Sequence, residues 1–236
     1  MSKKTKIIIE IIIILLIATG LGYYIYLDYQ KSKISENPKA EVISQIATLK
    51  FIKQDLDEEK KAKHQESFNE RAKIFLNNPE SIEAFWPLIG MAQIKELVGD
   101  IEGAKQALIW AAALQPQSYI AHGNLANLYF HHYQDFAKAE EHYLKAIEPD
   151  DPKTITYYFE LHEIYRYFYK RDTILAEDVL KLGIERYPQA TDLMSVLADY
   201  YRHLGRKEDA REYYLKILEI NPESQVAKRG LEELAK

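Results

Sequence analysis

Three histidines close together along the chain are the residues best suited to metal chemistry. His131, His132 and His142 surround one predicted turn, and Asp135 lies between them. Adjacent residues on a helix point about 100° apart, so His131 and His132 offer poor geometry for a shared ion. We interpret these side chains as turn and capping residues in a solvated region, and the sequence predicts no metal site.

The sequence also lacks the motifs of common enzymes. It contains no cysteine, which excludes thiolate nucleophiles, disulfides and Cys-based zinc or iron–sulfur centres. A Gly-x-Gly-x-x-Gly fingerprint, a phosphate-binding Gly-Lys-Ser/Thr loop and a His-Glu-x-x-His pair are all missing. The net charge of −5 argues against a nucleic-acid partner. We therefore expect a protein that is not an enzyme and uses no cofactor, so its function must be inferred from its architecture.

An internal repeat is the strongest pattern in the chain. Ala104, Ala139, Ala176 and Ala210 each open an Ala-x-x-x-Leu/Tyr unit, and the intervals between them are 35, 37 and 34 residues. Each unit ends near a proline, through which an α-helix cannot continue. Small residues at helical spacing let two antiparallel helices approach closely. The sequence predicts an all-α stack of helix pairs, in which each pair buries its apolar face only against its neighbours.

The pattern resembles the tetratricopeptide repeat (TPR) across residues 85–224. In its first helix, that family prefers a large residue, Leu, a Gly or Ala, and Tyr at spacings of 3, 1 and 3. The last unit matches with Met194, Leu197, Ala198 and Tyr201. The resemblance implies an α-solenoid whose first helices line a concave groove for a protein or peptide partner.

Two units depart from the family pattern. Lys95 stands at the tyrosine position of unit 85–118, and His162 stands where unit 154–190 should have Gly or Ala. Unit 154–190 also has two extra residues in its turn, and the stretch "HHYQDF" carries one extra residue in the unit before it. At His162 we expect either that the helices splay or that the register differs.

These patterns divide the chain into an N-terminal region and a solenoid. The predicted parts are a basic tail (1–6), a transmembrane anchor (7–27), a linker with an amphipathic helix (28–62) and the solenoid (63–236). The solenoid is expected to contain a degenerate first unit (63–84), four repeats (85–118, 119–153, 154–190 and 191–224) and a capping helix (225–236). The linker helix, about 40–56, follows from the apolar spacing of Val42, Ile46, Leu49, Ile52 and Leu56, and could pack on the first repeat or pair with another chain.

The segment Ile7–Leu27 is the candidate membrane anchor. Its 21 residues would extend roughly 31 Å as a helix, enough to cross a bilayer core. A buried strand and a cleaved signal peptide are the alternatives, although no Ala-x-Ala site follows. Glu10 can reach the headgroups or contact another membrane protein. Lys3, Lys4 and Lys6 place the N-terminus in the cytoplasm, so we expect a single-pass protein of the bacterial inner membrane with periplasmic repeats.

The repeat register predicts which first-helix residues face the concave groove. Aromatic and polar side chains alternate there, which suits an extended peptide or a helix, whereas a merely solvated inner wall is the alternative. The predicted partner-binding residues are Trp86, Gln93, Asn124, Asn127, Phe130, His131, Phe159, Glu163, Arg166, Ser195, Asp199 and Arg202.

Two functions are consistent with this architecture, which resembles bacterial membrane-anchored TPR proteins. The first is a membrane-anchored adaptor or scaffold that binds proteins outside the cytoplasm during the folding or assembly of envelope proteins and complexes. The second is a structural subunit of one fixed membrane complex, serving secretion, pilus assembly, cytochrome maturation or a translocon. Catalysis by a membrane-bound enzyme or metal carrier would require signatures that the sequence lacks.

Overall fold

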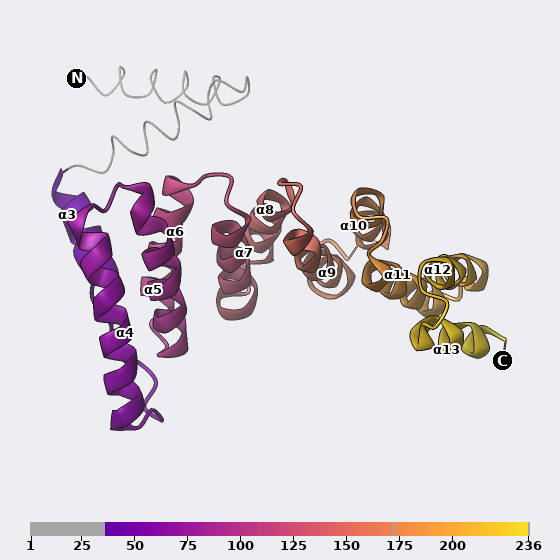
Figure 1. Ribbon diagram of the computed structural model, residues 1–236, viewed down its shortest axis with the longest axis horizontal. Coiled ribbons are helices and arrows are strands. Elements are labelled where there is room, and N and C mark those ends of the chain that lie inside the picture. The colour runs from indigo at the N-terminus through magenta and orange to yellow at the C-terminus, as the bar shows by residue number, and fades with distance from the viewer. Residues whose placement is uncertain (1–35, 172, 236) are drawn as a thin grey trace, which may run out of the picture. The chain divides into compact units, whose positions relative to one another are not determined.

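The computed structural model describes residues 36–171 and 173–235 (Figure 1). The described residues form helices and connecting turns, with no strand among them. The chain divides into two units, residues 1–48 and 49–236, and the described part of the first unit contains one helix, α3 (Glu36–Ile46). The predicted basic tail, the anchor at 7–27 and Glu10 lie outside the described residues. Within those residues, no helix has the length and apolar character needed to cross a bilayer.

The predicted amphipathic helix at 40–56 is wrong in its second half. Helix α3 ends at Ile46, and residues 49–57 carry no helix. The backbone N–H groups of Ile52 and Lys53 instead both donate to the Val98 carbonyl, each at 3.0 Å. That carbonyl lies at a helix end, where the last C=O groups have no partner within the helix. Tertiary hydrogen bonds therefore take N–H groups that a continuous helix would use internally.

The second unit is a row of helices that mostly pair with their neighbours along the chain (Figure 1). Short turns connect them, which reverses the chain direction between neighbours. Unit 63–84 contributes most of a single long helix, as expected of a degenerate repeat. The helices are α4 (Glu58–Asn77), α5 (Phe85–Leu97), α6 (Ile101–Leu114), α7 (Tyr119–Leu128), α8 (Phe136–Ile147), α9 (Ile155–Glu163), α10 (Thr173–Arg186), α11 (Thr191–His203), α12 (Lys207–Ile220) and α13 (Gln225–Leu234).

The small residues of the repeat lie at the helix contacts, as the register requires. Ala104, Ala139, Ala176 and Ala210 are all fully buried. Gly123 on α7 shows how close the approach becomes, because a Cβ built there would lie 2.1 Å from the Tyr157 hydroxyl of α9. Any larger residue at these positions would force the helices apart.

The extra residues of two repeats form π-helical turns. One turn, η2 (Tyr129–Tyr133), extends α7, and the other, η4 (Ile164–Phe168), extends α9. The Tyr169 N–H closes the second turn on the Ile164 carbonyl at 2.8 Å. A π-turn inserts one residue into a helix, so it rotates every side chain that follows relative to the ideal 3.6-residue period. The helix thus absorbs the insertion that the sequence places in a loop.

The two departures from the family pattern are both buried. Lys95 is completely buried and its ammonium lies 2.8 Å from Asp100 and 5.1 Å from the centre of the Phe68 ring. Burial lowers the pKa of Lys95, against the opposing effect of Asp100. The His162 ring is buried between α9 and α10, with Nδ1 2.8 Å from the Ala176 carbonyl. The Lys95 ammonium and His162 Nδ1 thus each have a specific partner, whereas the buried His162 Nε2 makes no hydrogen bond with the described residues.

Helix α13 covers the end of the stack, as predicted for residues 225–236. The Ser224 hydroxyl accepts from the Ala227 N–H and caps its first turn. Ala227, Gly230 and Leu234 are buried, and a Cβ at Gly230 would lie 2.3 Å from the Tyr214 ring. The hydroxyl end of the Tyr214 ring therefore packs closely against the capping helix.

Candidate functional site

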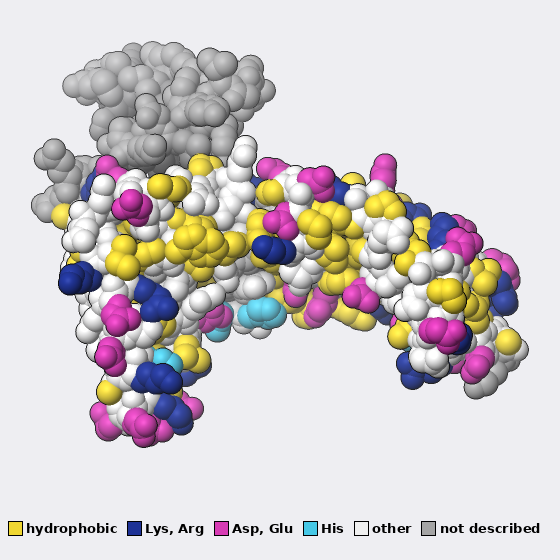
Figure 2. All heavy atoms as spheres, viewed as in Figure 1, with side chains coloured by type: hydrophobic (Ala, Val, Ile, Leu, Met, Phe, Trp, Pro, Cys, Tyr) yellow, Lys and Arg dark blue, Asp and Glu magenta, His cyan; other side chains and the backbone are white. Residues whose placement is uncertain are grey.

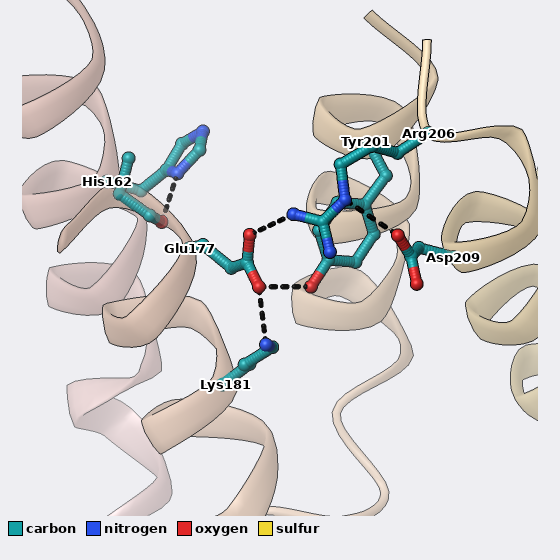
Figure 3. A network of polar contacts seen from close by, with 7 residues as sticks. His162, Glu177, Lys181, Tyr201, Arg206 and Asp209 are labelled. Atoms are coloured by element: carbon teal, nitrogen blue, oxygen red, sulfur yellow. Dashed lines mark hydrogen bonds and ion pairs between the residues drawn. The ribbon is translucent and has the colours of Figure 1, made fainter. Parts of the chain in front are cut away.

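Tyrosine hydroxyls join successive helix pairs through partly buried carboxylates. Tyr165 donates to Glu140 at 2.7 Å, and the equivalent Tyr201 donates to Glu177 at 2.8 Å (Figure 3). In each case the tyrosine belongs to a first helix or its π-turn, and the glutamate belongs to the second helix of the preceding unit. The contacts set the spacing of neighbouring units, and so the positions of the residues on their open faces.

Each carboxylate also binds cations. Arg206 lies 2.5 Å from Glu177, and Lys181 contacts the same carboxylate from within α10 (Figure 3). Burial alone would raise the pKa of Glu177, but hydrogen bonds from Lys181, Tyr201 and Arg206 outweigh it and hold this pKa below its ordinary value. Burial, together with the glutamate, raises the pKa of Tyr201 to about 12. The pair is thus a phenol that donates to a carboxylate that is ionised at pH 7.

A second set of tyrosine contacts positions two predicted groove residues. The Tyr143 hydroxyl donates to Asn127 Oδ1 at 2.6 Å, and the Tyr214 hydroxyl donates to Asp199 Oδ1 at 2.6 Å. In both units the donor is the tyrosine four residues after the repeat alanine on the second helix, and the acceptor lies on the first helix. These hydrogen bonds fix the orientation of the polar groups on the open faces of α7 and α11.

The charges of Glu160 and Glu163 on α9 act on the Tyr143 hydroxyl, which donates to Asn127 of α7. Burial, and then the charges of Glu160 and Glu163, raise the pKa of Tyr143. Burial and the charge of Glu163 likewise raise the pKa of Glu160, while His131 opposes them. Asn127 therefore contacts Tyr143, whereas Glu160, Glu163 and His131 act in this region through their charges, and their joint role in a groove stays a prediction. Sequence reasoning missed Glu160, although it lies three residues before Glu163 on the same helix.

The groove residues of the last unit are engaged within the protein. Arg202 lies 3.0 Å from Asp199 and 2.8 Å from Glu233 of the capping helix. Arg166 of the preceding unit lies over the rings of Tyr167 and Tyr200, at 4.8 and 5.1 Å. Both arginines are partly buried, as are Asn124, Phe159 and Ser195. This end of the predicted surface is consequently more closed than the register suggests.

Phe130 corrects the predicted set of aromatic anchors. We expected it to face a partner, but only 7% of its surface is exposed. Its ring lies 5.9 Å from Phe136 and 5.3 Å from Phe168, in edge contacts. The π-turn that begins at Tyr129 rotates Phe130 inward, so it belongs to the core. Of the three aromatic residues expected to anchor a partner, only Trp86 is largely open to solvent.

Trp86 and Gln93 are exposed on α5, at the other end of the row. Trp86 lines a shallow cleft with Glu70, Arg71 and Ile74 of α4 and with its neighbour Pro87. Sequence reasoning did not identify the α4 residues, because this helix lacks the small residues of the family. The spacing of three between Arg71 and Ile74 was the one available signal that they share a face.

The three histidines considered as metal ligands lie apart from one another. His142 packs against His122, with 3.1 Å between the two Nδ1 atoms. His132 lies 2.9 Å from Glu96, and the His131 ring lies tilted against Phe130, with 4.6 Å between ring centres. Within residues 36–171 and 173–235, no three or more histidine or acidic side chains are arranged to hold a metal ion.

The pairing of His122 with His142 fixes the protons on both rings. His122 Nε2 lies 2.9 Å from the Pro116 carbonyl, so this nitrogen carries the proton and Nδ1 accepts. His142 Nδ1 must then donate to His122. Burial lowers the pKa of His122, and burial together with the charge of His122 lowers that of His142 to about 4. Both rings are therefore neutral at pH 7.

Charged groups on the visible face of the molecule are mixed in sign. Figure 2 shows acidic and basic side chains interspersed with hydrophobic ones, without a large field of either charge. Such a surface does not suit a polyanion such as nucleic acid. It suits recognition through local combinations of apolar and charged groups.

Comparison with known families agrees with this geometry. Residues 92–153 and residues 192–224 each match a family model described as tetratricopeptide repeat. This chain is a tetratricopeptide repeat protein. Neither matched segment includes residues 154–190, the repeat that contains the buried His162 and one of the two π-turns. No curated protein sequence matches the chain.

Solved TPR structures share the fold at low sequence identity. The crystal structure of MamA is 18% identical, with a TM-score of 0.53, over 72% of this chain and 97% of that one. PilF of Pseudomonas aeruginosa is 13% identical, with a TM-score of 0.55, over 75% of this chain and 77% of that one. These likenesses show the fold alone. The matches to the tetratricopeptide repeat models support a protein–protein interaction scaffold.

Proposed function

We propose that this chain is a membrane-anchored TPR scaffold that binds proteins outside the cytoplasm, during the folding or assembly of envelope proteins. One observation carries the binding role: the Tyr143 hydroxyl donates to Asn127 Oδ1 at 2.6 Å and orients this amide, while Glu163 on α9 and His131 on η2 are exposed. Preorganised polar groups beside partly buried aromatic rings recognise a polypeptide without having to be ordered first. The apolar segment Ile7–Leu27 supports the membrane attachment.

Site-specific crosslinking tests the binding face. A photoreactive phenylalanine analogue replaces Gln93 or Glu163, which are exposed on first helices, and Glu141 serves as the control because it is exposed on a second helix. We expect crosslinked partners in cells from positions 93 and 163 and none from position 141. Crosslinks from position 141 alone would contradict binding through the first helices.

Charge reversal on the same face gives a quantitative measure. Arg166→Glu should weaken capture of the crosslinked partner by about tenfold, which corresponds to about 1.4 kcal/mol. Lys216→Glu removes a cation from the outer face of α12 and should leave capture unchanged. Circular dichroism at matched temperatures establishes that both variants are folded, so an equal loss in both would reject the assignment of the face.

Protease protection tests the proposed topology. In intact spheroplasts, added protease reaches only the outer side of the membrane. We expect it to degrade the repeats there. Repeats that survive until the membrane is broken would instead lie in the cytoplasm, and the extracytoplasmic role would be abandoned.

A fixed membrane complex is the second candidate, and one observation favours it. Ile109, Leu144 and Leu215 occupy equivalent positions on α6, α8 and α12, and all three are exposed. Apolar side chains repeated along an outer face fit a permanent subunit contact better than transient binding. A complex of constant stoichiometry after extraction in mild detergent would favour this candidate, whereas variable partners would favour the scaffold.

A further inference from the structure

We propose that the cleft between α4 and α5 binds a partner segment in which a carboxylate side chain neighbours a bulky apolar one. The carboxylate pairs with Arg71, and the apolar side chain packs on Trp86 and Ile74. The inference rests on the proposed scaffold function and deepens it, because it names the chemistry of the partner at one end of the row.

The apolar wall of the cleft is open to solvent. Glu70, Arg71, Ile74, Trp86 and Pro87 line a shallow cleft of about 350 Å³. Trp86 is 63% exposed and Ile74 is 51% exposed, although both side chains are large and hydrophobic. The Trp86 and Phe85 rings meet in an edge-to-face contact, with 5.2 Å between ring centres. Tryptophan is enriched among the residues that contribute most to protein interfaces, so an exposed tryptophan beside a branched aliphatic residue suits the anchoring of a partner.

The cation of the cleft is held in place without a carboxylate partner. Arg71 Nη1 donates to the Ser67 carbonyl at 2.7 Å and to the Ser67 hydroxyl at 2.6 Å. Its side chain crosses Gly90 of α5, where a Cβ would lie 2.4 Å from Arg71 Nε. Among the described residues, no acidic side chain forms an ion pair with Arg71. The absence of a side chain at Gly90 thus lets the guanidinium stem lie across the α4–α5 contact.

The charge balance of the cleft specifies the occupant. An arginine with unused N–H donors binds a planar carboxylate in two parallel hydrogen bonds, which lysine cannot do. Glu70 stands exposed at the rim and repels a second negative charge. The cleft therefore favours a segment with one carboxylate beside a large apolar residue over both a polyanion and an uncharged apolar helix.

Peptide selection on the full-length chain tests the proposal. A random twelve-residue peptide library displayed on phage is selected against the protein in detergent micelles. We expect the selected peptides that bind this cleft to hold Asp or Glu within a few residues of Leu, Phe or Trp. Replacing that acid by its amide in the synthetic peptide should weaken binding by about tenfold.

Matched protein variants locate the contact. Arg71→Gln and Trp86→Ala should each weaken binding of the selected peptide at least tenfold, whereas Lys73→Gln removes an exposed cation of the same helix and should have no effect. The affinity of the Arg71→Gln variant for the amide peptide should be no weaker than the affinity measured with either change alone, because both changes remove the same ion pair.

The outcomes separate this proposal from the scaffold function. If peptides are selected that lack an acid, or that bind Arg71→Gln and Trp86→Ala as tightly as the parent, the cleft proposal is wrong. If the Arg166→Glu variant no longer bound those selected peptides, the scaffold function would still be supported. A selection that yields no binding peptide overturns the cleft proposal, and crosslinking at positions 93 and 163 still decides the scaffold function independently.

Discussion

Tyr201 and Glu177 join the last two repeats through one short hydrogen bond, 2.8 Å from hydroxyl to carboxylate. The residues are 24 positions apart in the sequence and lie on different helix pairs. Tyr165 and Glu140 repeat the arrangement one junction earlier. Tyrosine at this position of the repeat is therefore a connector between units as well as a packing residue.

Removing the Tyr201 hydroxyl tests this connection. Tyr201→Phe keeps the buried ring but removes a hydrogen bond to an ionised acceptor, so the free energy of unfolding should fall by about 1–2 kcal/mol. Tyr213→Phe is the matched control, since within the described residues that hydroxyl forms no hydrogen bond. Urea denaturation measures both, and an equal change in the two variants would show that the Glu177 contact contributes nothing specific.

The histidine pair makes stability depend on pH. Because the folded-state pKa of His142 is about 4, below the unfolded value of about 6.5, the unfolded chain binds more protons between these values. The stabilisation is complete above pH 6.5 and is lost as the pH falls toward 4. From the size of this shift we expect a loss of about 2–3 kcal/mol in the free energy of unfolding, measured by urea midpoints at intervals from pH 7 to 4.

A matched pair of variants isolates this dependence. Asparagine can donate to His122 as His142 does, but it does not titrate, so His142→Asn should flatten the curve between pH 6.5 and 4. His64→Asn replaces a histidine of α4 and should retain the slope. Lys138, Glu141 and Lys145 also act on His142, so the comparison is made at constant ionic strength. Unchanged slopes in His142→Asn would assign the pH dependence to other groups.

Two neighbouring alanines of α8 test the repeat register. Ala139→Trp inserts a large ring at a fully buried helix contact and should lower stability by at least about 1–3 kcal/mol, while also loosening the adjacent repeats. Ala137→Trp places the same ring on the exposed side of the helix and should leave the thermal midpoint nearly unchanged. Similar melting curves for both variants would refute the register.

The corrected position of Phe130 gives a distinct prediction. Phe130→Ala removes a buried ring from the contacts with Phe136 and Phe168, and should reduce stability by about 3–5 kcal/mol. A groove anchor would behave differently, losing partner capture while the thermal midpoint stayed the same. Calorimetry on the variant without any partner therefore distinguishes the two roles directly.

Local periodicity was enough to predict the repeat units and their buried alanines. Spacing near 34 residues and small side chains at helical intervals depend only on neighbours in the chain, and Ala139 and Ala210 are buried as that pattern requires. The capping helix followed from the same logic, since an open end of a stack needs a cover. The apolar segment Ile7–Leu27 was also identified from sequence alone and stays a prediction.

Tertiary structure decided the features that break this periodicity. The helix pairs could be predicted from the sequence, because each 3.6-residue pattern is local. Phe130 was placed wrongly, because a π-turn shifts that period by one residue. It also extended the linker helix past Ile46, where hydrogen bonds to Val98 compete with helix formation. The Arg71–Gly90 contact and the Tyr201–Glu177 bond join different helices, so only the packed stack brings those residues together.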